Sequence, residues 1–145
     1  MLYKFLHKII LAACFFAISA CEKEVECPVP GVEYFDFQVN LESLMSMTTI
    51  EIAGYGYQRH GIIIYRHVYE YQVSAFDATC VDNADCLERG KVRHSKENDS
   101  QGKCIRCSAV YNFTDGMHTQ KKVRLRAYSI TPVDNSNILW RLSNR

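Results

Sequence analysis

Several features of common functional classes are missing from this 145-residue sequence. It has no apolar run of the about 20 residues that a transmembrane helix needs. Its net charge is only +1 and its basic residues are scattered, so we expect no nucleic-acid binding. No serine, histidine and aspartate arrangement or paired-carboxylate motif stands out, and Gly54-x-Gly56 lacks the further glycine and the helix of a phosphate-binding loop. We therefore expect no catalysis.

The N-terminus carries a short basic segment and then a short apolar one. Lys4 and Lys8 supply positive charge, residues 9–18 form an apolar stretch, and two small residues precede Cys21. This order is typical of a secretory signal. A cysteine directly after the small residues resembles the lipobox of bacterial lipoproteins, in which the thiol is acylated and becomes the new N-terminus. An ordinary cleaved signal, or an uncleaved anchor, is the alternative.

The lipobox resemblance divides the chain into three parts. Residues 1–20 would be a signal peptide, residues 21–31 a lipidated tether, and residues 32–145 one domain. Lipid on Cys21 would hold the protein on a membrane without a membrane-spanning segment. The acidic run at residues 22–26 resembles sorting signals for the cell surface, although a solvated linker is the more economical interpretation. We expect a location at the outer membrane or cell surface of a Gram-negative envelope. No protein partner can be named from the sequence.

Beyond the tether, the spacing of apolar residues predicts strands. The candidate strands are residues 32–39, 50–53, 62–65, 69–76, 110–113, 123–128 and 138–142. A polar turn at residues 134–137 should join the last two as a hairpin. Only residues 41–47 look helical, and that stretch is short. The pattern predicts an all-β protein, a sandwich or small barrel of about seven to nine strands.

Four cysteines form the main candidate site. Cys80 and Cys86 are separated by five residues, and Cys104 and Cys107 by two. The second spacing occurs in zinc ribbons and rubredoxin-like sites, where two thiolates from one turn reach the same ion. The intervening residues 87–103 are polar and charged, so we expect an exposed excursion. Cys27 is the odd cysteine, either free or paired with another chain.

The segments around these cysteines resemble the Rieske ferredoxin domain. The similar stretches are Gly-Ile-Ile-Ile-Tyr-Arg at residues 61–66, Tyr-Gln-Val-Ser-Ala-Phe-Asp-Ala-Thr-Cys at residues 71–80, and Cys-Ile-Arg-Cys-Ser-Ala-Val-Tyr-Asn-Phe-Thr-Asp-Gly at residues 104–116. The resemblance spans roughly residues 32–142 and is closest to Rieske-like lipoproteins of the Bacteroidetes group. It implies a Rieske-like β-sandwich with a cysteine-rich loop subdomain at one tip.

The sequence also departs from the Rieske pattern at both histidine ligands. A Rieske centre reads Cys-x-His and Cys-x2-His, but Asp82 and Cys107 stand in the two histidine positions. The histidines that follow the expected signal peptide do not restore the motif, and we expect each in a solvated loop or strand; they are His60, His67, His94 and His118. No arginine precedes Arg59, so a twin-arginine signal that would export a folded, cluster-loaded protein is missing. We therefore do not expect a two-iron cluster.

Three states of the four cysteines remain open: a metal site, a pair of disulfides, or a mixture of the two. Zinc or iron could bind Cys80, Cys86, Cys104 and Cys107 after export, or disulfides could join the two loops in an oxidising compartment. A redox-active pair at Cys104 and Cys107 near Arg106 is less favoured, because a strand rather than a helix should follow it. The leading hypothesis is an envelope lipoprotein with a structural four-cysteine tip. The alternative is an electron-transfer protein with an iron or iron–sulfur centre there.

Overall fold

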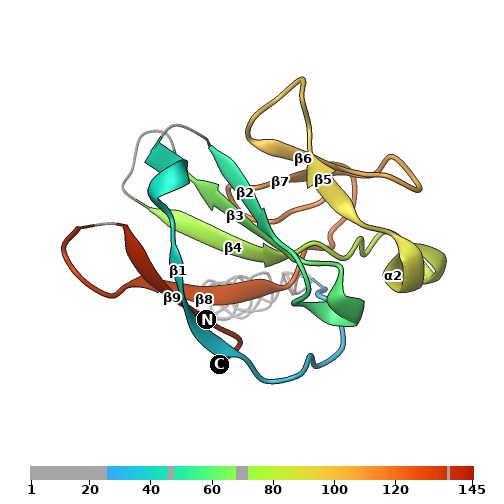
Figure 1. The fold of residues 1–145 in the computed structure, drawn as a ribbon. Coiled ribbons are helices and arrows are strands. Elements are labelled where there is room, and N and C mark those ends of the chain that lie inside the picture. Colours follow the sequence, from blue (N-terminus) through green and yellow to red (C-terminus); the bar gives the residue numbers. More distant parts are fainter. Residues whose placement is uncertain (1–25, 46–47, 68–71, 137) are drawn as a thin grey trace, which may run out of the picture.

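The fold was analysed in a computed structural model that describes residues 26–45, 48–67, 72–136 and 138–145. In these residues, Figure 1 shows strands and short helices. The strands are β1 (Asp36–Asn40), β2 (Thr49–Ile52), β3 (Ile62–Arg66), β4 (Val73–Asp77), β5 (Val92–His94), β6 (Gln101–Cys104), β7 (Val110–Asn112), β8 (Ala127–Pro132) and β9 (Leu139–Ser143). The helices are the 3-10 turns η1 (Glu42–Met45) and η2 (Tyr57–Arg59) and the α-helix α2 (Ala84–Arg89). No helix in the described part of the chain is long and apolar enough to cross a membrane.

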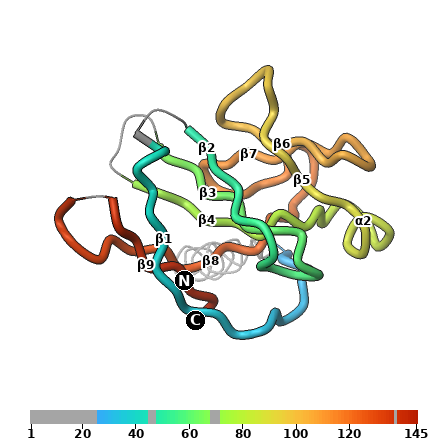
Figure 2. Tube along the Cα trace, viewed as in Figure 1, coloured from blue at the N-terminus to red at the C-terminus, as the bar shows by residue number. Residues whose placement is uncertain are grey.

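The strands form two antiparallel sheets. Six pair in the order β1-β9-β8-β4-β3-β2, and three in the order β5-β6-β7. The larger sheet curls, and the smaller one lies to one side of it with α2 (Figures 1 and 2). The all-β prediction is confirmed. The predicted hairpin is also confirmed, since β8 pairs with β9; Asn137 of its turn lies outside the described residues.

Strand β3 explains the longest apolar run of the domain. Side chains alternate between the two faces of a strand. Ile62 and Ile64 pack on one face of the sheet, and Ile63 and Tyr65 on the other, with all four at most 3% exposed. A strand buried on both faces needs apolar residues at every position rather than at alternate ones. The two faces of β3 therefore belong to two different cores.

We call these two groups of buried residues the sheet core and the tip core. The sheet core comprises Phe35, Leu41, Leu44, Ile62, Ile64, Ala75, Tyr128, Trp140 and Leu142. The tip core comprises Val29, Ile63, Tyr65, Phe76, Ala78, Cys80, Val81, Cys86, Val92, Cys104, Tyr111, Phe113 and Leu125. Burial of Val29 in the tip core shows that part of the expected tether belongs to the folded domain. The tip core lies between the large sheet and the elements that carry the cysteines.

Three expectations about local structure were wrong. Residues 87–103 are not an exposed excursion, because they include the end of α2, strand β5 and most of β6, and Val92 is fully buried. The polar residues that suggested a loop lie on α2, on the exposed side of β5 and β6, and in the exposed connection between these two strands. The strand expected at residues 123–128 begins only at Ala127, since Val123 makes an isolated bridge with Glu26. The strand expected at residues 32–39 begins at Asp36.

Candidate metal centre

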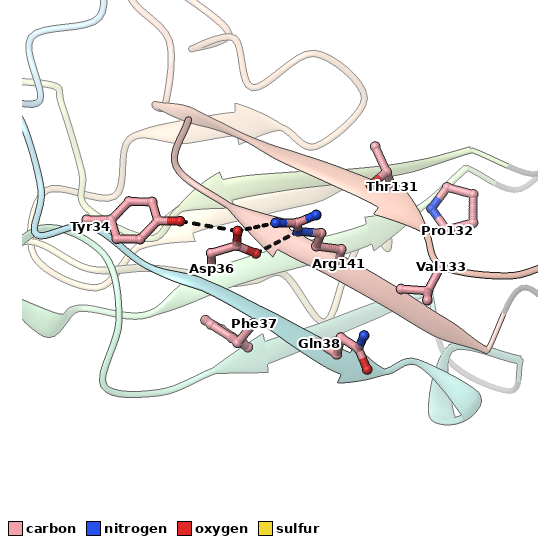
Figure 3. A pocket seen from close by; sticks show the side chains of 8 residues that line it. All are labelled: Tyr34, Asp36, Phe37, Gln38, Thr131, Pro132, Val133 and Arg141. Atoms are coloured by element: carbon pink, nitrogen blue, oxygen red, sulfur yellow. Dashed lines mark hydrogen bonds and ion pairs between the residues drawn. The ribbon is translucent and has the colours of Figure 1, made fainter.

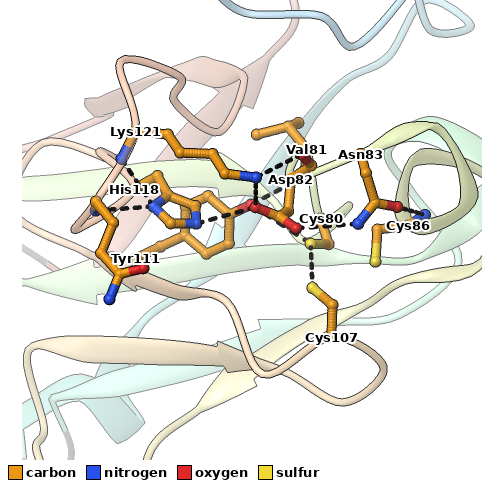
Figure 4. A network of polar contacts seen from close by, with 10 residues as sticks. Cys80, Val81, Asp82, Asn83, Cys86, Cys107, Tyr111, His118 and Lys121 are labelled. Carbon is orange, nitrogen blue, oxygen red and sulfur yellow. Dashed lines mark hydrogen bonds and ion pairs between the residues drawn. The ribbon is translucent and has the colours of Figure 1, made fainter.

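The structure brings the four predicted cysteines together. Their Sγ atoms all lie within 4.8 Å of one another, and those of Cys80 and Cys107 are 3.6 Å apart. Cys80, Cys86 and Cys104 are at most 1% exposed, whereas Cys107 is partly exposed. Figure 4 shows three of these cysteines and the polar groups around them. Two loops that are distant in sequence thus converge on one small volume.

The first loop begins where β4 ends, at a buried carboxylate. Asp77 is fully buried and accepts hydrogen bonds from the Tyr57 amide (2.6 Å), the Thr79 amide (2.8 Å) and the Tyr128 hydroxyl. A buried carboxylate is stable only with such partners. This network fixes the chain three residues before Cys80. The Cys80 amide then donates to the carbonyl of Gly90 (2.9 Å), which ties Cys80 to the end of α2.

Cys86 is placed by helix α2. Asn83 caps the helix, since its Oδ1 accepts the amide hydrogen of Cys86 (2.9 Å). The helix ends at Gly90, whose amide donates to the Cys86 carbonyl (2.6 Å). A Cβ atom on Gly90 would lie 2.7 Å from that carbonyl oxygen and 3.0 Å from Cys80 Cβ. Only glycine therefore lets the chain pass this close to both cysteines.

The second loop is a tight turn between β6 and β7. The amide of Cys104 donates to the Ala109 carbonyl (2.8 Å), and the amide of Ser108 donates to the Cys104 carbonyl (3.1 Å). Ser108 takes a left-handed conformation with φ 63°. The amide of Ile105 donates to the Lys91 carbonyl (3.0 Å), which joins this turn to the segment after α2. Cys104 and Cys107 therefore leave one turn and reach the same place, as their spacing predicts.

The sulfur atoms differ in their electrostatic surroundings. Burial raises the pKa of Cys86 to about 12 and also raises the pKa of Cys80. Burial acts in the same direction on Cys104, but the backbone N–H groups of Cys107 and Arg106 outweigh it and hold the pKa of Cys104 below its ordinary value. A cation at the centre would favour the thiolate form of all four sulfurs.

Two hydrogen-bond donors reach the sulfurs from outside the set of four. The Arg106 amide lies 3.4 Å from Cys104 Sγ. The Tyr111 hydroxyl lies 3.4 Å from Cys80 Sγ and accepts the amide hydrogen of Val81 (3.1 Å), so its own hydrogen is free to donate to sulfur. Tyr111 is fully buried. Such outer partners orient metal ligands and tune their charge.

Asp82, which occupies an expected histidine position, contacts other side chains rather than joining the sulfur group. It forms an ion pair with Lys121, and its Oδ1 lies 3.3 Å from His118 Nε2 (Figure 4). That separation is within ion-pair range, although Nε2 makes no aligned hydrogen bond. The hydrogen bond from Lys121 lowers the pKa of Asp82, and burial lowers the pKa of His118.

The expectation that every histidine is solvated was wrong for His118, which is 6% exposed. Its Nδ1 accepts the amide hydrogens of Gln120 (2.9 Å) and Lys121 (3.2 Å), and its ring packs edge-on against Tyr111. His60 and His67 are partly buried and bond hydroxyl groups, while His94 lies beside Asp99. No histidine joins the sulfur group among the described residues.

The sulfur positions fit one tetrahedral ion. Zinc–thiolate bonds of about 2.3 Å at tetrahedral angles place the sulfurs about 3.8 Å apart. The Cys80–Cys107 separation of 3.6 Å and the 4.8 Å upper limit agree with that spacing. In a two-iron cluster, two ligands bind each iron, so the two pairs of ligands stand apart at opposite ends of the cluster. Four mutually close sulfurs fit a single ion better than a two-iron cluster.

Sequence reasoning missed three residues of this site: Asn83, Gly90 and Tyr111. The first two had a detectable signal. Asparagine before a helix, an acidic residue in its first turn and glycine at its end form a helix start and stop pattern. The pattern was overlooked because the helix has only six residues and lies in a stretch that looked like a loop. Tyr111 had no such signal because its hydroxyl reaches Cys80 across 31 positions of sequence. Cys21 lies outside the described residues, and Cys27 is exposed.

A separate surface hollow of about 680 Å³ lies on the large sheet, lined by residues of β1, β8, β9 and the segments beside them (Figure 3). Arg141 forms a two-pronged ion pair with Asp36 there, and the Tyr34 hydroxyl donates to the same carboxylate (3.2 Å). These groups satisfy one another. None of the four clustered cysteines lines this hollow, so the cysteine cluster and the hollow are separate features.

No protein-family model matches the chain, and no curated protein matches it. Three similar solved structures were compared. A protein described as an NADH-dependent nitrite reductase small subunit from Mycobacterium tuberculosis is 9% identical over 78% of this chain and 97% of its own, with a TM-score of 0.45. A chain from the complex of reduced oxygenase and oxidized ferredoxin in carbazole 1,9a-dioxygenase is 16% identical over 76% of this chain and 94% of its own, with a TM-score of 0.48. The ferredoxin of carbazole 1,9a-dioxygenase from Nocardioides aromaticivorans IC177 is 17% identical over 73% of this chain and 95% of its own, with a TM-score of 0.42. Such values assign neither a family nor a cofactor.

Proposed function

We propose that this protein is an envelope lipoprotein, anchored through Cys21, whose Rieske-like domain holds one zinc or iron ion as a structural centre. The observation that carries the metal proposal is the convergence of four Sγ atoms within 4.8 Å of one another. The ligands would be Cys80, Cys86, Cys104 and Cys107. Thiolates are the preferred ligands of zinc and of iron in such sites.

A structural role follows from the number of ligands. Four protein thiolates fill a tetrahedral coordination sphere and leave no position for a substrate. When bound, the ion supplies a cross-link between segments far apart in the chain. Cys80 lies on the loop after β4, Cys86 lies in α2, and the other two lie on the β6–β7 turn. The backbone bonds of Gly90, Ile105 and Ala109 orient these segments for ligation.

The metal proposal is tested on the full chain purified from the membrane of the bacterium that expresses it. Elemental analysis should find one equivalent of zinc or iron, and thiol titration after denaturation should find the four centre cysteines reduced. Replacing Cys86 with Ser should remove the metal, whereas replacing the exposed Cys27 with Ser should leave it in place. A metal-free protein whose centre thiols are consumed in disulfides would refute the proposal.

Anchoring has its own test. The mass of the N-terminal peptide should show acyl chains on Cys21, and Cys21→Ala should release the protein from the membrane fraction or stop its processing. An unmodified Cys21 in the membrane-bound protein would contradict the lipoprotein assignment. This result is independent of the metal content, so the two halves of the proposal stand or fall separately.

Electron transfer is the second candidate, and the partly exposed Cys107 favours it. A sulfur ligand near solvent would give an electron a short route to a partner. The Tyr111 hydroxyl and the Arg106 amide would stabilise negative charge on the sulfurs. Iron at the site would produce visible absorbance and a reversible potential, which Tyr111→Phe should shift to a lower value. Zinc would produce neither signal.

A further inference from the structure

Two exposed cations lie unpaired on the segment that precedes β8. Residues 121–126 read Lys-Lys-Val-Arg-Leu-Arg. Lys121 is engaged in the ion pair with Asp82, and Arg126 donates to two backbone carbonyls of the N-terminal segment. Lys122 and Arg124 are exposed, and no carboxylate among the described residues pairs with either. We call Lys122 and Arg124 the basic strip.

The basic strip lies where the N-terminal segment enters the domain. The amide of Glu26 donates to the Lys122 carbonyl (3.3 Å), and the amide of Arg124 donates to the Glu26 carbonyl (3.0 Å). Glu26 is five residues from Cys21. Five residues span at most about 18 Å, even when fully extended. A lipid on Cys21 would therefore keep the backbone at Glu26, and the strip beside it, close to the membrane surface.

We propose that Lys122 and Arg124 dock on anionic phospholipid headgroups of the leaflet that carries the acyl chains of Cys21. This inference rests on the anchoring stated under "Proposed function". Acyl chains hold the protein at the membrane but leave the domain free to turn about its tether. Basic side chains near an anionic surface are attracted over about one Debye length, roughly 8–10 Å at physiological salt. The strip thereby orients the domain with its N-terminal edge toward the lipid.

A second basic pair offers an internal control. Arg93 on β5 and Lys103 on β6 face each other across the hairpin, are exposed, and have no carboxylate partner among the described residues. Their hairpin makes no backbone hydrogen bond with the described N-terminal segment. The tether therefore does not hold Arg93 and Lys103 near the membrane as it does the strip. Both Lys122 and Lys103 are exposed, but only Lys122 should become shielded when the protein contacts the membrane.

The test uses the acylated full chain in vesicles of phosphatidylcholine, with or without about one third phosphatidylglycerol. An amine-reactive label and mass spectrometry then measure the modification rate of each lysine. With phosphatidylglycerol, the rate at Lys122 should fall about fivefold or more, while the rate at Lys103 stays constant. Salt at about 1 M shortens the Debye length to about 3 Å and should restore the rate at Lys122. Arg124→Gln should restore part of it at low salt, and Arg93→Gln should not.

Equal labelling of Lys122 in the two kinds of vesicle would overturn the proposal, as would protection of Lys103 in place of Lys122. A Cys21 peptide without acyl chains would refute the anchoring and this proposal together. The mass of that peptide distinguishes this outcome from a domain that is anchored but makes no headgroup contact.

Discussion

The two cores of this protein are stabilised in different ways. The sheet core contains only aliphatic and aromatic side chains, carried mainly by strands of four to six residues. The tip core contains three buried cysteines, and the sheet beside it has strands of three or four residues. Short strands pair through few backbone hydrogen bonds and are marginal on their own. A metal ion on the four cysteines, as proposed above, would give the tip core a cross-link that the sheet core lacks.

If the proposed metal is bound, its removal should produce the largest difference in stability between the two cores. Structural zinc sites contribute apparent binding free energies of about 10–16 kcal/mol, which become folding free energy. After removal of the ion by a chelator, amide hydrogens of β5 and β6 should lose their exchange protection, while those of β3 keep theirs. Mass-detected hydrogen exchange measures both in one sample. If β3 opened together with β5 and β6, the sheet core would depend on the metal too.

A cavity in the sheet core should destabilise the sheet core without affecting the metal site. Leu142 is fully buried on β9, and Leu142→Ala should lower the free energy of unfolding by about 2–5 kcal/mol. The loss should be the same with and without metal, and metal content should not change. Denaturant unfolding of both forms measures this. The matched variant in the tip core, Val92→Ala, should instead lower metal retention. Release of metal by the Leu142→Ala protein would show that the metal site depends on the sheet core.

Crowding at Gly90 should act on the tip alone. A Cβ there would press on the Cys86 carbonyl and on Cys80 Cβ, and such overpacking costs about 1–3 kcal/mol. Gly90→Ala should therefore accelerate metal loss to a colorimetric chelator and lower the melting temperature. Gly31→Ala is the control, because a Cβ at Gly31 meets nothing within 4 Å. Equal behaviour of the two variants would show that the α2 end does not hold the cysteines in place.

The helix cap should have the smallest effect. Asn83→Ala removes the side-chain acceptor of the Cys86 amide and should cost about 1 kcal/mol. Asn83→Asp keeps an acceptor and should restore most of the stability. Thermal unfolding of the metal-loaded protein measures both variants. A loss that Asp fails to restore would point to a role of Asn83 other than capping.

The all-β class, the β8–β9 hairpin and the four clustered cysteines could be predicted from the sequence because each has a local pattern. Alternation marks strands, a polar cluster marks the turn, and Cys104 and Cys107 lie within one turn. The pairing of Cys80 and Cys86 with Cys104 and Cys107 was harder to predict, because Cys86 lies on a helix of only six residues that has little sequence signal. The hairpin of β5 and β6 was missed because its outward charges hid the inward Val92. Burial of His118 depends on contacts across the fold that no local pattern records.

The three consecutive isoleucines of strand β3 cannot by themselves fix its register. A slip by one residue exchanges the two faces of a strand, and at Ile62, Ile63 and Ile64 the exchange would put isoleucine in place of isoleucine. The correct alignment must therefore be fixed at the ends of the run. At one end, Gly61 has φ 109° and approaches so closely that a Cβ would lie 3.0 Å from the Ile52 carbonyl oxygen. At the other end, Tyr65 packs in the tip core, so the glycine and the tyrosine decide which isoleucines face the tip core and which face the sheet core.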